Sequence, residues 1–132
     1  MTIFNGEASP REWAITHAPA ANAQATISRA AESGKRHICT GICIKVVGNT
    51  TAANATGTLA HLRDGASGAG TILQSFIMLS TAAGATDTVT LTGLNIIGSV
   101  NVAMTLELAA APGAAIQASV ALSGHTIDAL YA

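Results

Sequence analysis

Short runs of alternating side chains, each closed by a turn-forming residue, follow one another from about residue 24 to the end of the chain. They recur at intervals of roughly 8 to 14 residues, separated by segments rich in Gly, Asn, Asp-Gly or Pro-Gly. No long stretch has the 3.6-residue periodicity of a helix. We expect strands at residues 24–31, 36–47, 56–63, 71–79, 86–91, 94–97, 101–109 and 115–123, and a tail from residue 124 that can continue as a strand.

About eight strands at this spacing are typical of an all-β fold. We predict a single-domain antiparallel β-sandwich that is jelly-roll-like or of another Greek-key topology. A chain of 132 residues suits one such domain and can bury one hydrophobic core. Alternation with a period of two gives each sheet a core face and an outer face. Thus Ile72, Phe76 and Met78 are expected to share one face of their run, and Met104 and Leu108 one face of theirs.

The first 23 residues have a different character, because two prolines interrupt them and they contain the only tryptophan of the chain. We divide the chain into an extended N-terminal arm, residues 1–23, and a β-sandwich domain, residues 24–132. Trp13 and Ile15 in this arm need a surface to cover them. That surface is either the core of the same chain or a neighbouring subunit; without one, the arm is disordered.

The two cysteines lie in the long run 36–47. Strict alternation would place Ile38 and Ile42 on one face and Cys39 and Cys43 together on the other. At roughly 3.3 Å per residue the two cysteines would be about 13 Å apart, beyond the roughly 7 Å between Cα atoms that a disulfide allows. We therefore interpret both as small buried hydrophobic residues.

Charged residues make up only 10% of the chain, against about 25% in an average soluble domain. The six basic residues are scattered, which argues against direct binding of nucleic acid. No apolar run approaches the roughly 18 residues that a membrane span needs. The first residues do not resemble a signal peptide, so we expect synthesis in a cytoplasm. Outer faces built from Thr, Ser, Ala and Gln cost little to desolvate and can pack flat against other proteins.

No motif predicts catalysis, a cofactor or a metal site, and we expect the chain not to be an enzyme. The segment 65–70, GASGAG, lacks the Lys and Ser/Thr of a phosphate-binding loop and is interpreted as a flexible hairpin tip. His37 and His61 do not follow the spacing of a zinc site with the cysteines. His61 and Arg63 share one strand face, either as a solvated polar edge or as a hydrogen-bond cluster at an interface.

Several segments between about residues 24 and 125 are similar in sequence pattern to those of a known class of proteins. They are ATISRA at 25–30, GKRHICTGI at 34–42, LRDGASGAGTIL at 62–73, LTGLNIIG at 91–98, AMTLE at 103–107 and VALSG at 120–124. The chain resembles the small structural proteins of tailed bacteriophages, and among them the capsid cement, or decoration, proteins with a jelly-roll-like β-sandwich. The resemblance covers roughly three-quarters of the chain and excludes the arm.

The resemblance implies a dimer or trimer on the outer surface of an icosahedral head, bound where neighbouring major capsid subunits meet. Tryptophan is enriched at interface hot spots, so the arm is the expected anchor. The candidate interface residues are Phe4, Trp13, Ile15, His61 and Arg63. Two alternatives stay open: a tail, fibre or head–tail protein that binds a receptor or another virion subunit, and a carbohydrate-binding module. The second is weakened by the small number of aromatic residues.

Overall fold

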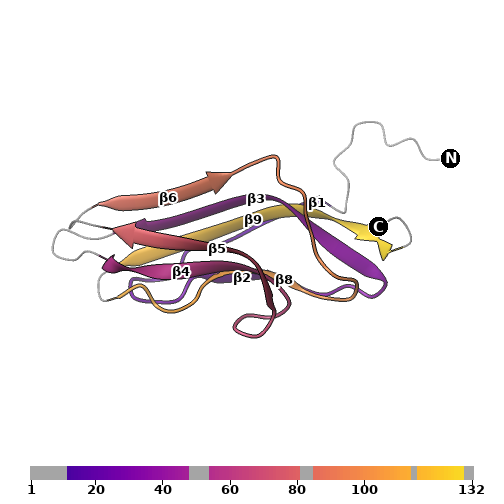
Figure 1. The fold of residues 1–132 in the computed structure, drawn as a ribbon, viewed down its shortest axis with the longest axis horizontal. Coiled ribbons are helices and arrows are strands. Elements are labelled where there is room, and N and C mark those ends of the chain that lie inside the picture. The colour runs from indigo at the N-terminus through magenta and orange to yellow at the C-terminus, as the bar shows by residue number, and fades with distance from the viewer. Residues whose placement is uncertain (1–11, 48–53, 81–84, 114–115, 130–132) are drawn as a thin grey trace.

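The computed structural model describes residues 12–47, 54–80, 85–113 and 116–129 (Figure 1). These segments contain nine strands and no α-helix. The strands are β1 (Glu12–His17), β2 (Thr26–Arg29), β3 (Lys35–Val47), β4 (Asn54–Asp64), β5 (Thr71–Ser80), β6 (Thr86–Leu91), β7 (Ile96–Ile97), β8 (Met104–Leu108) and β9 (Gln117–Asp128). The all-β prediction is confirmed, and the tail from residue 124 does continue as the end of β9.

The strands form two antiparallel sheets that pack face to face. Sheet A has the order β1-β9-β3-β6, with the short β7 also paired to β3, and sheet B has the order β2-β8-β4-β5. Four of the strand pairs correspond to one long hairpin whose tip lies between β4 and β5. They are β1–β9, β2–β8, β3–β6 and β4–β5. Rolling up this hairpin brings β9 beside β3 and β8 beside β4, which is the jelly-roll arrangement.

The core between the sheets follows the expected alternation over most of its extent. Met104, Leu106 and Leu108 of β8 are fully buried, and Val120 and Leu122 of β9 face them from sheet A. Figure 1 shows the two layers from the side on which the edge strands β5 and β6 lie.

Residues 12–17, which the sequence analysis placed in the extended arm, form β1, an edge strand of sheet A paired along its length with β9. The ring of Trp13 packs against Gly124, where a side chain would leave no room, and only 9% of Trp13 is exposed. Of the two surfaces considered for Trp13, the structure shows the core of the same chain. The prediction for residues 1–11, including Phe4, lies outside the described residues.

A chain of hydrogen bonds satisfies the polar groups around Trp13. Its Nε1 donates to Thr126 Oγ1 at 3.0 Å, and Thr126 Oγ1 lies 2.7 Å from His37 Nδ1. His37 Nε2 lies 2.7 Å from the Ala30 carbonyl oxygen, which can only accept, so Nε2 carries the hydrogen. With the hydrogen on Nε2, Nδ1 can accept from the Thr126 hydroxyl. The guanidinium of Arg29 covers the indole at 5.6 Å, so polar and cationic contacts fix β1 in place.

A β-bulge in β3 overturns the strict alternation predicted for residues 36–47. The register with β9 shifts between Cys39 and Gly41, so Thr40 is an extra residue. Cys39 therefore points into the core together with Ile42, whereas Cys43 lies on the outer face. The two cysteines are on opposite faces, not on the same one.

Candidate interaction surfaces

The structure places most of the predicted interface residues inside the chain's own contacts. Trp13 is in the core and Ile15 packs partly against it. His61 is buried, and the side chain of Arg63 is 14% exposed and bound to Glu107. These four residues thus present little surface to another chain.

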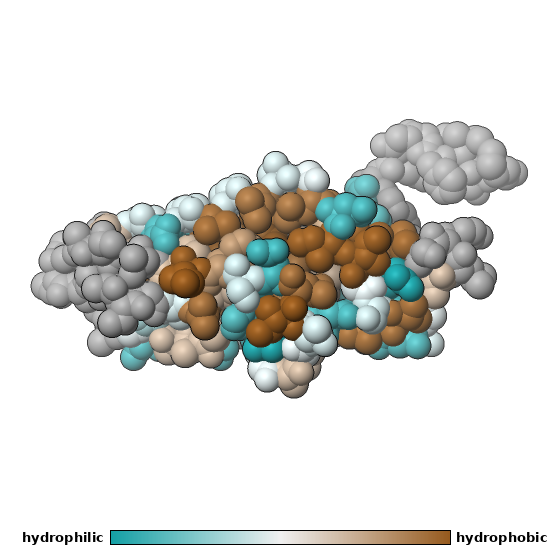
Figure 2. Space-filling view, viewed as in Figure 1, coloured by the Kyte–Doolittle hydropathy of each residue, from teal (hydrophilic) through white to brown (hydrophobic). Residues whose placement is uncertain are grey.

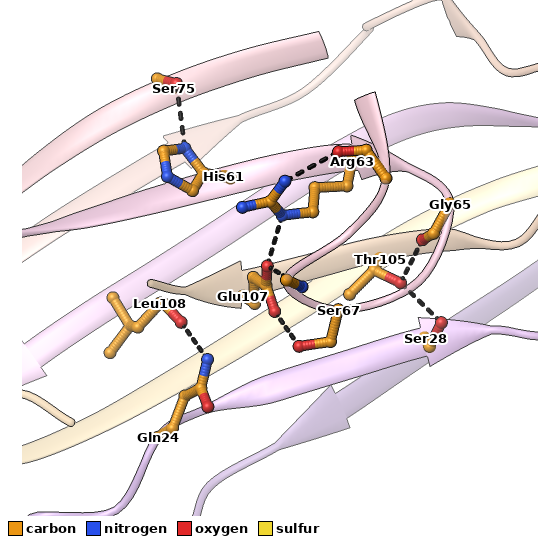
Figure 3. Close-up of polar contacts among 12 residues, drawn as sticks. Gln24, Ser28, His61, Arg63, Gly65, Ser67, Ser75, Thr105, Glu107 and Leu108 are labelled. Atoms are coloured by element: carbon orange, nitrogen blue, oxygen red, sulfur yellow. Dashed lines mark hydrogen bonds and ion pairs between the residues drawn. The ribbon is translucent and has the colours of Figure 1, made fainter. Parts of the chain in front are cut away.

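His61 and Arg63 do share one face of β4, as predicted, but that face is not a solvated edge (Figure 3). Arg63 Nε donates to Glu107 Oε1 at 2.5 Å, and Arg63 Nη1 donates to the Gly70 carbonyl oxygen at 2.7 Å. Glu107 Oε1 also accepts from the Gly68 amide at 3.0 Å, and its Oε2 accepts from the Ser67 hydroxyl. Glu107 is 1% exposed, so these donors replace water around a buried carboxylate.

The segment 65–70, expected as a flexible tip, folds back over the outer face of β8. The Gly65 amide donates to the Ala103 carbonyl oxygen at 2.7 Å, and the Thr105 hydroxyl donates to the Gly65 carbonyl oxygen at 2.8 Å. This loop explains why all five residues of β8 are buried, although alternation leaves one face of a strand outside the core. The polar cluster is thus a structural clasp, because the exposed loop residues Ser67 and Gly68 help to satisfy an ion pair, Arg63 with Glu107, that is largely closed off from solvent.

The clasp changes the acidity of Glu107. Burial by itself raises the pKa of this carboxyl group, but the hydrogen bonds from Ser67 and Gly68 and the charge and hydrogen bond of Arg63 outweigh it. The pKa is therefore held below its ordinary value of about 4.5.

A lowered pKa makes the clasp sensitive to acid. The unfolded chain binds the proton more readily, so the stabilisation is fully present above about pH 4.5 and is lost as the pH falls through the folded-state pKa. We expect urea unfolding curves to show a free energy of unfolding that declines below about pH 4.5. In Glu107→Gln, which cannot ionise, the decline should be shallower. Equal slopes for the two proteins would contradict a role for Glu107 in acid sensitivity.

Elsewhere in the described segments, the Cys39 thiol lies buried in the core. Burial raises the pKa of the Cys39 thiol to about 11, which keeps it protonated at neutral pH. The described residues hold no group of three or more His, Cys, Asp or Glu side chains that could bind a metal ion. Within the same residues, no helix is long and apolar enough to span a membrane.

The outer face of sheet A is an open surface of small side chains. One row crosses β1, β9, β3 and β6 through four cross-strand neighbours, Thr16, Ala121, Cys43 and Thr90. The next row holds Ala14, Ser123 and Gly41. Together these seven residues form what we call the small-residue face. They line most of a shallow hollow of about 180 Å³.

Charge stands only at the margins of the small-residue face. Glu12 lies beyond Ala14 on β1, and Lys45 lies beyond Cys43 on β3. A partner can therefore cover the centre without desolvating an ionised group, which is the main cost of burying a polar surface.

A second surface carries the exposed large hydrophobic side chains. They are Leu59 of β4, Ile72 and Ile77 of β5, Leu91 of β6 and Ile97 of β7. These strands lie on the side where sheet A ends in β6 and sheet B ends in β5. Figure 2 views this side, and apolar surface gathers across its middle. We call this surface the apolar side.

The sequence reasoning predicted uncharged outer faces of small side chains but located neither of these two surfaces. It assigned Ile72 to the same face as Phe76 and Met78, but a bulge at Leu73 turns Ile72 outward, while Met78 stays in the core. One available signal was that residues 71–80, TILQSFIMLS, contain no charged residue on either face. Edge strands usually carry charge that discourages pairing with other chains.

No protein-family model matches the chain, and no curated protein matches it at a significant level.

Proposed function

We propose that the chain is a structural protein of a bacteriophage particle, a cement protein that binds the outside of the head where neighbouring major capsid subunits meet. The observation that carries the proposal is the small-residue face, with the uncharged row Thr16, Ala121, Cys43 and Thr90 across four strands. The jelly-roll fold and the resemblance of residues 24–125 to phage cement proteins support it. Fold alone does not determine function, so the proposal rests on this surface.

The mechanism is mechanical. Packaged DNA presses the shell outward, and a protein that bridges two subunits adds surface that must be exposed again before they separate. A contact of about 1,600 Å² is typical of a stable complex, and apolar burial contributes about 25 cal/mol per Å². Association costs reduce this gain strongly for one copy. Many symmetric copies on one shell nevertheless act together.

Co-sedimentation with empty heads of the parent phage that lack the chain tests this proposal. We expect the wild-type protein to pellet with the heads and to raise their resistance to heat or chelator. Ala121→Lys should weaken binding more than tenfold, because it places a charge at the centre of the small-residue face. Ala69→Lys, the same change at an exposed position of the 65–70 loop, should bind like the wild type.

Thermal unfolding of both variants checks that they fold. Wild-type protein that stays in the supernatant overturns the proposal. If the protein then pellets with purified tails or host cells, the alternative of a tail or fibre component takes its place. Equal binding by the Ala121 and Ala69 variants would assign the contact to a different surface.

A further inference from the structure

The outer edge of β5 has the length and the uncharged composition of a strand that pairs with another strand. Among the strands that the structure describes, β5 is the last of sheet B, so one row of its backbone amides and carbonyls faces away from β4. The strand has ten residues and no charged side chain. The other edge of sheet B, β2, carries Arg29, and the edges of sheet A carry Glu12 on β1 and Asp87 on β6. A long, uncharged, apolar edge is the kind that pairs with another strand.

The exposed side chains of β5 are arranged symmetrically. Ser75 pairs with His61 of β4, and Ile77 pairs with Leu59, two positions further along. Toward the start of β5, the bulge at Leu73 makes Ile72 the partner of Arg63. Arg63 is also two positions from His61 along β4. Ile72 and Ile77 are therefore equidistant from Ser75 in pairing register and point to the same outer face. They are 45% and 69% exposed.

This symmetry identifies the occupant of the edge. An antiparallel strand can pair with a copy of itself around a two-fold axis, provided that residues on either side of the axis match in face and chemistry. With the axis at Ser75, Ile72 of each copy lies opposite Ile77 of the other, and Gln74 lies opposite Phe76. Because β5 contains no charge, the pairing brings no like charges together.

We propose that β5 pairs antiparallel with β5 of a second copy around a two-fold axis at Ser75. The two four-stranded B sheets then become one sheet of eight strands. Leu59 and Ile77 of each copy form an apolar cluster with Ile72 of the other, on both sides of the axis. The pairing occupies the β5 edge of both copies, so no β5 edge is left to bind a third copy. The assembly therefore closes at a dimer and does not extend into fibres. The inference does not rest on head binding, which uses the small-residue face on the other sheet.

Light scattering after size-exclusion chromatography tests the assembly of the full chain. We expect the wild type to have twice the 13.1 kDa monomer mass. Ile77→Lys should raise the dimer dissociation constant at least about a hundredfold, because the substitution occurs twice in the interface. Ile77 is largely exposed in the single chain, so this variant should keep its fold. Thr88→Lys, at an exposed strand position of β6, should remain dimeric.

Disulfide trapping tests the position of the axis. Residues directly opposite each other in an antiparallel pair have Cα atoms about 4.5 to 5.5 Å apart, within the range of a disulfide. In a Cys43→Ser background, Ser75→Cys should cross-link to dimers under mild oxidation much faster than Thr88→Cys. A monomeric or trimeric wild type, a dimer unaffected by Ile77→Lys, or equal cross-linking at both cysteines overturns the proposal. Each of these results is independent of whether the protein binds heads.

Discussion

Gly124→Ala is expected to lower the free energy of unfolding by about 3 kcal/mol or more, although it adds a single methyl group. A Cβ atom at residue 124 would lie 2.1 Å from the Ile38 carbonyl oxygen and 2.8 Å from Cη2 of Trp13. The first of these atoms belongs to the backbone of β3, so no side-chain rotation can relieve the contact. Either β9 separates from β3, or the strand shifts and displaces Trp13 with β1.

The effect should appear as a fall in melting temperature of roughly 10 °C or more. Gly34→Ala is the matched control. Gly34 has a φ of 72° and nothing within 4 Å of an added Cβ, so it tests backbone strain without a clash. It should cost about 1 to 2 kcal/mol. A Gly124 variant that is as stable as the Gly34 variant would show that the packing of β1 on β9 is looser than the structure indicates.

Most of the fold could be predicted from the sequence because its determinants are local. Alternating side chains and turn residues define β3, β4, β5, β6, β8 and β9 without knowledge of their partners. Strand β1 also alternates, with Trp13, Ile15 and His17 toward the core and Ala14 and Thr16 outward. Its docking, however, depends on Gly124 and Thr126, more than a hundred residues later. Local reasoning therefore interpreted it as an arm.

Bulges are the second reason why prediction stopped short of the interaction surfaces. One extra residue, Thr40 in β3 and Leu73 in β5, reverses which side chains face outward beyond it. The composition of the chain indicated an uncharged surface. Only the register placed Cys39 in the core with Ile42, and Ile72 on the same side as Ile77.

The clasp shows a third limit of prediction from sequence. The sequence correctly placed His61 and Arg63 on one face of β4, but it did not indicate what covers that face. His61 and Arg63 share a face of β4, but the partner that buries Arg63 is Glu107, 44 residues later. The loop 65–70, composed of Gly, Ala and Ser, gives no sequence signal that it folds over a neighbouring strand. Polar residues on one strand face are expected both where the face is solvated and where a polar loop covers it, so their pattern does not identify which of the two occurs.

Glu107→Leu is expected to lower the free energy of unfolding by about 3 to 5 kcal/mol, because it leaves the guanidinium of Arg63 without its anion. Only 14% of the Arg63 side chain is exposed, so water cannot replace the lost carboxylate without opening the loop. The same substitution frees Ser67 and the Gly68 amide, whose residues are exposed and can bond to water. Urea denaturation at neutral pH measures the loss.

The double variant Arg63→Met with Glu107→Leu distinguishes the stability lost through an unpaired buried charge from the stability lost through other contacts of the carboxylate. If the cost of the single variant comes from an unpaired buried charge, removing the second charge should restore most of the lost stability, because apolar side chains of similar length can fill the site. We expect the double variant to be more stable than Glu107→Leu by at least about 2 kcal/mol. Equal instability of the two would mean that the carboxylate acts mainly by anchoring the 65–70 loop through Ser67 and Gly68. Limited proteolysis of that loop, faster in both variants than in the wild type, would then confirm the anchor.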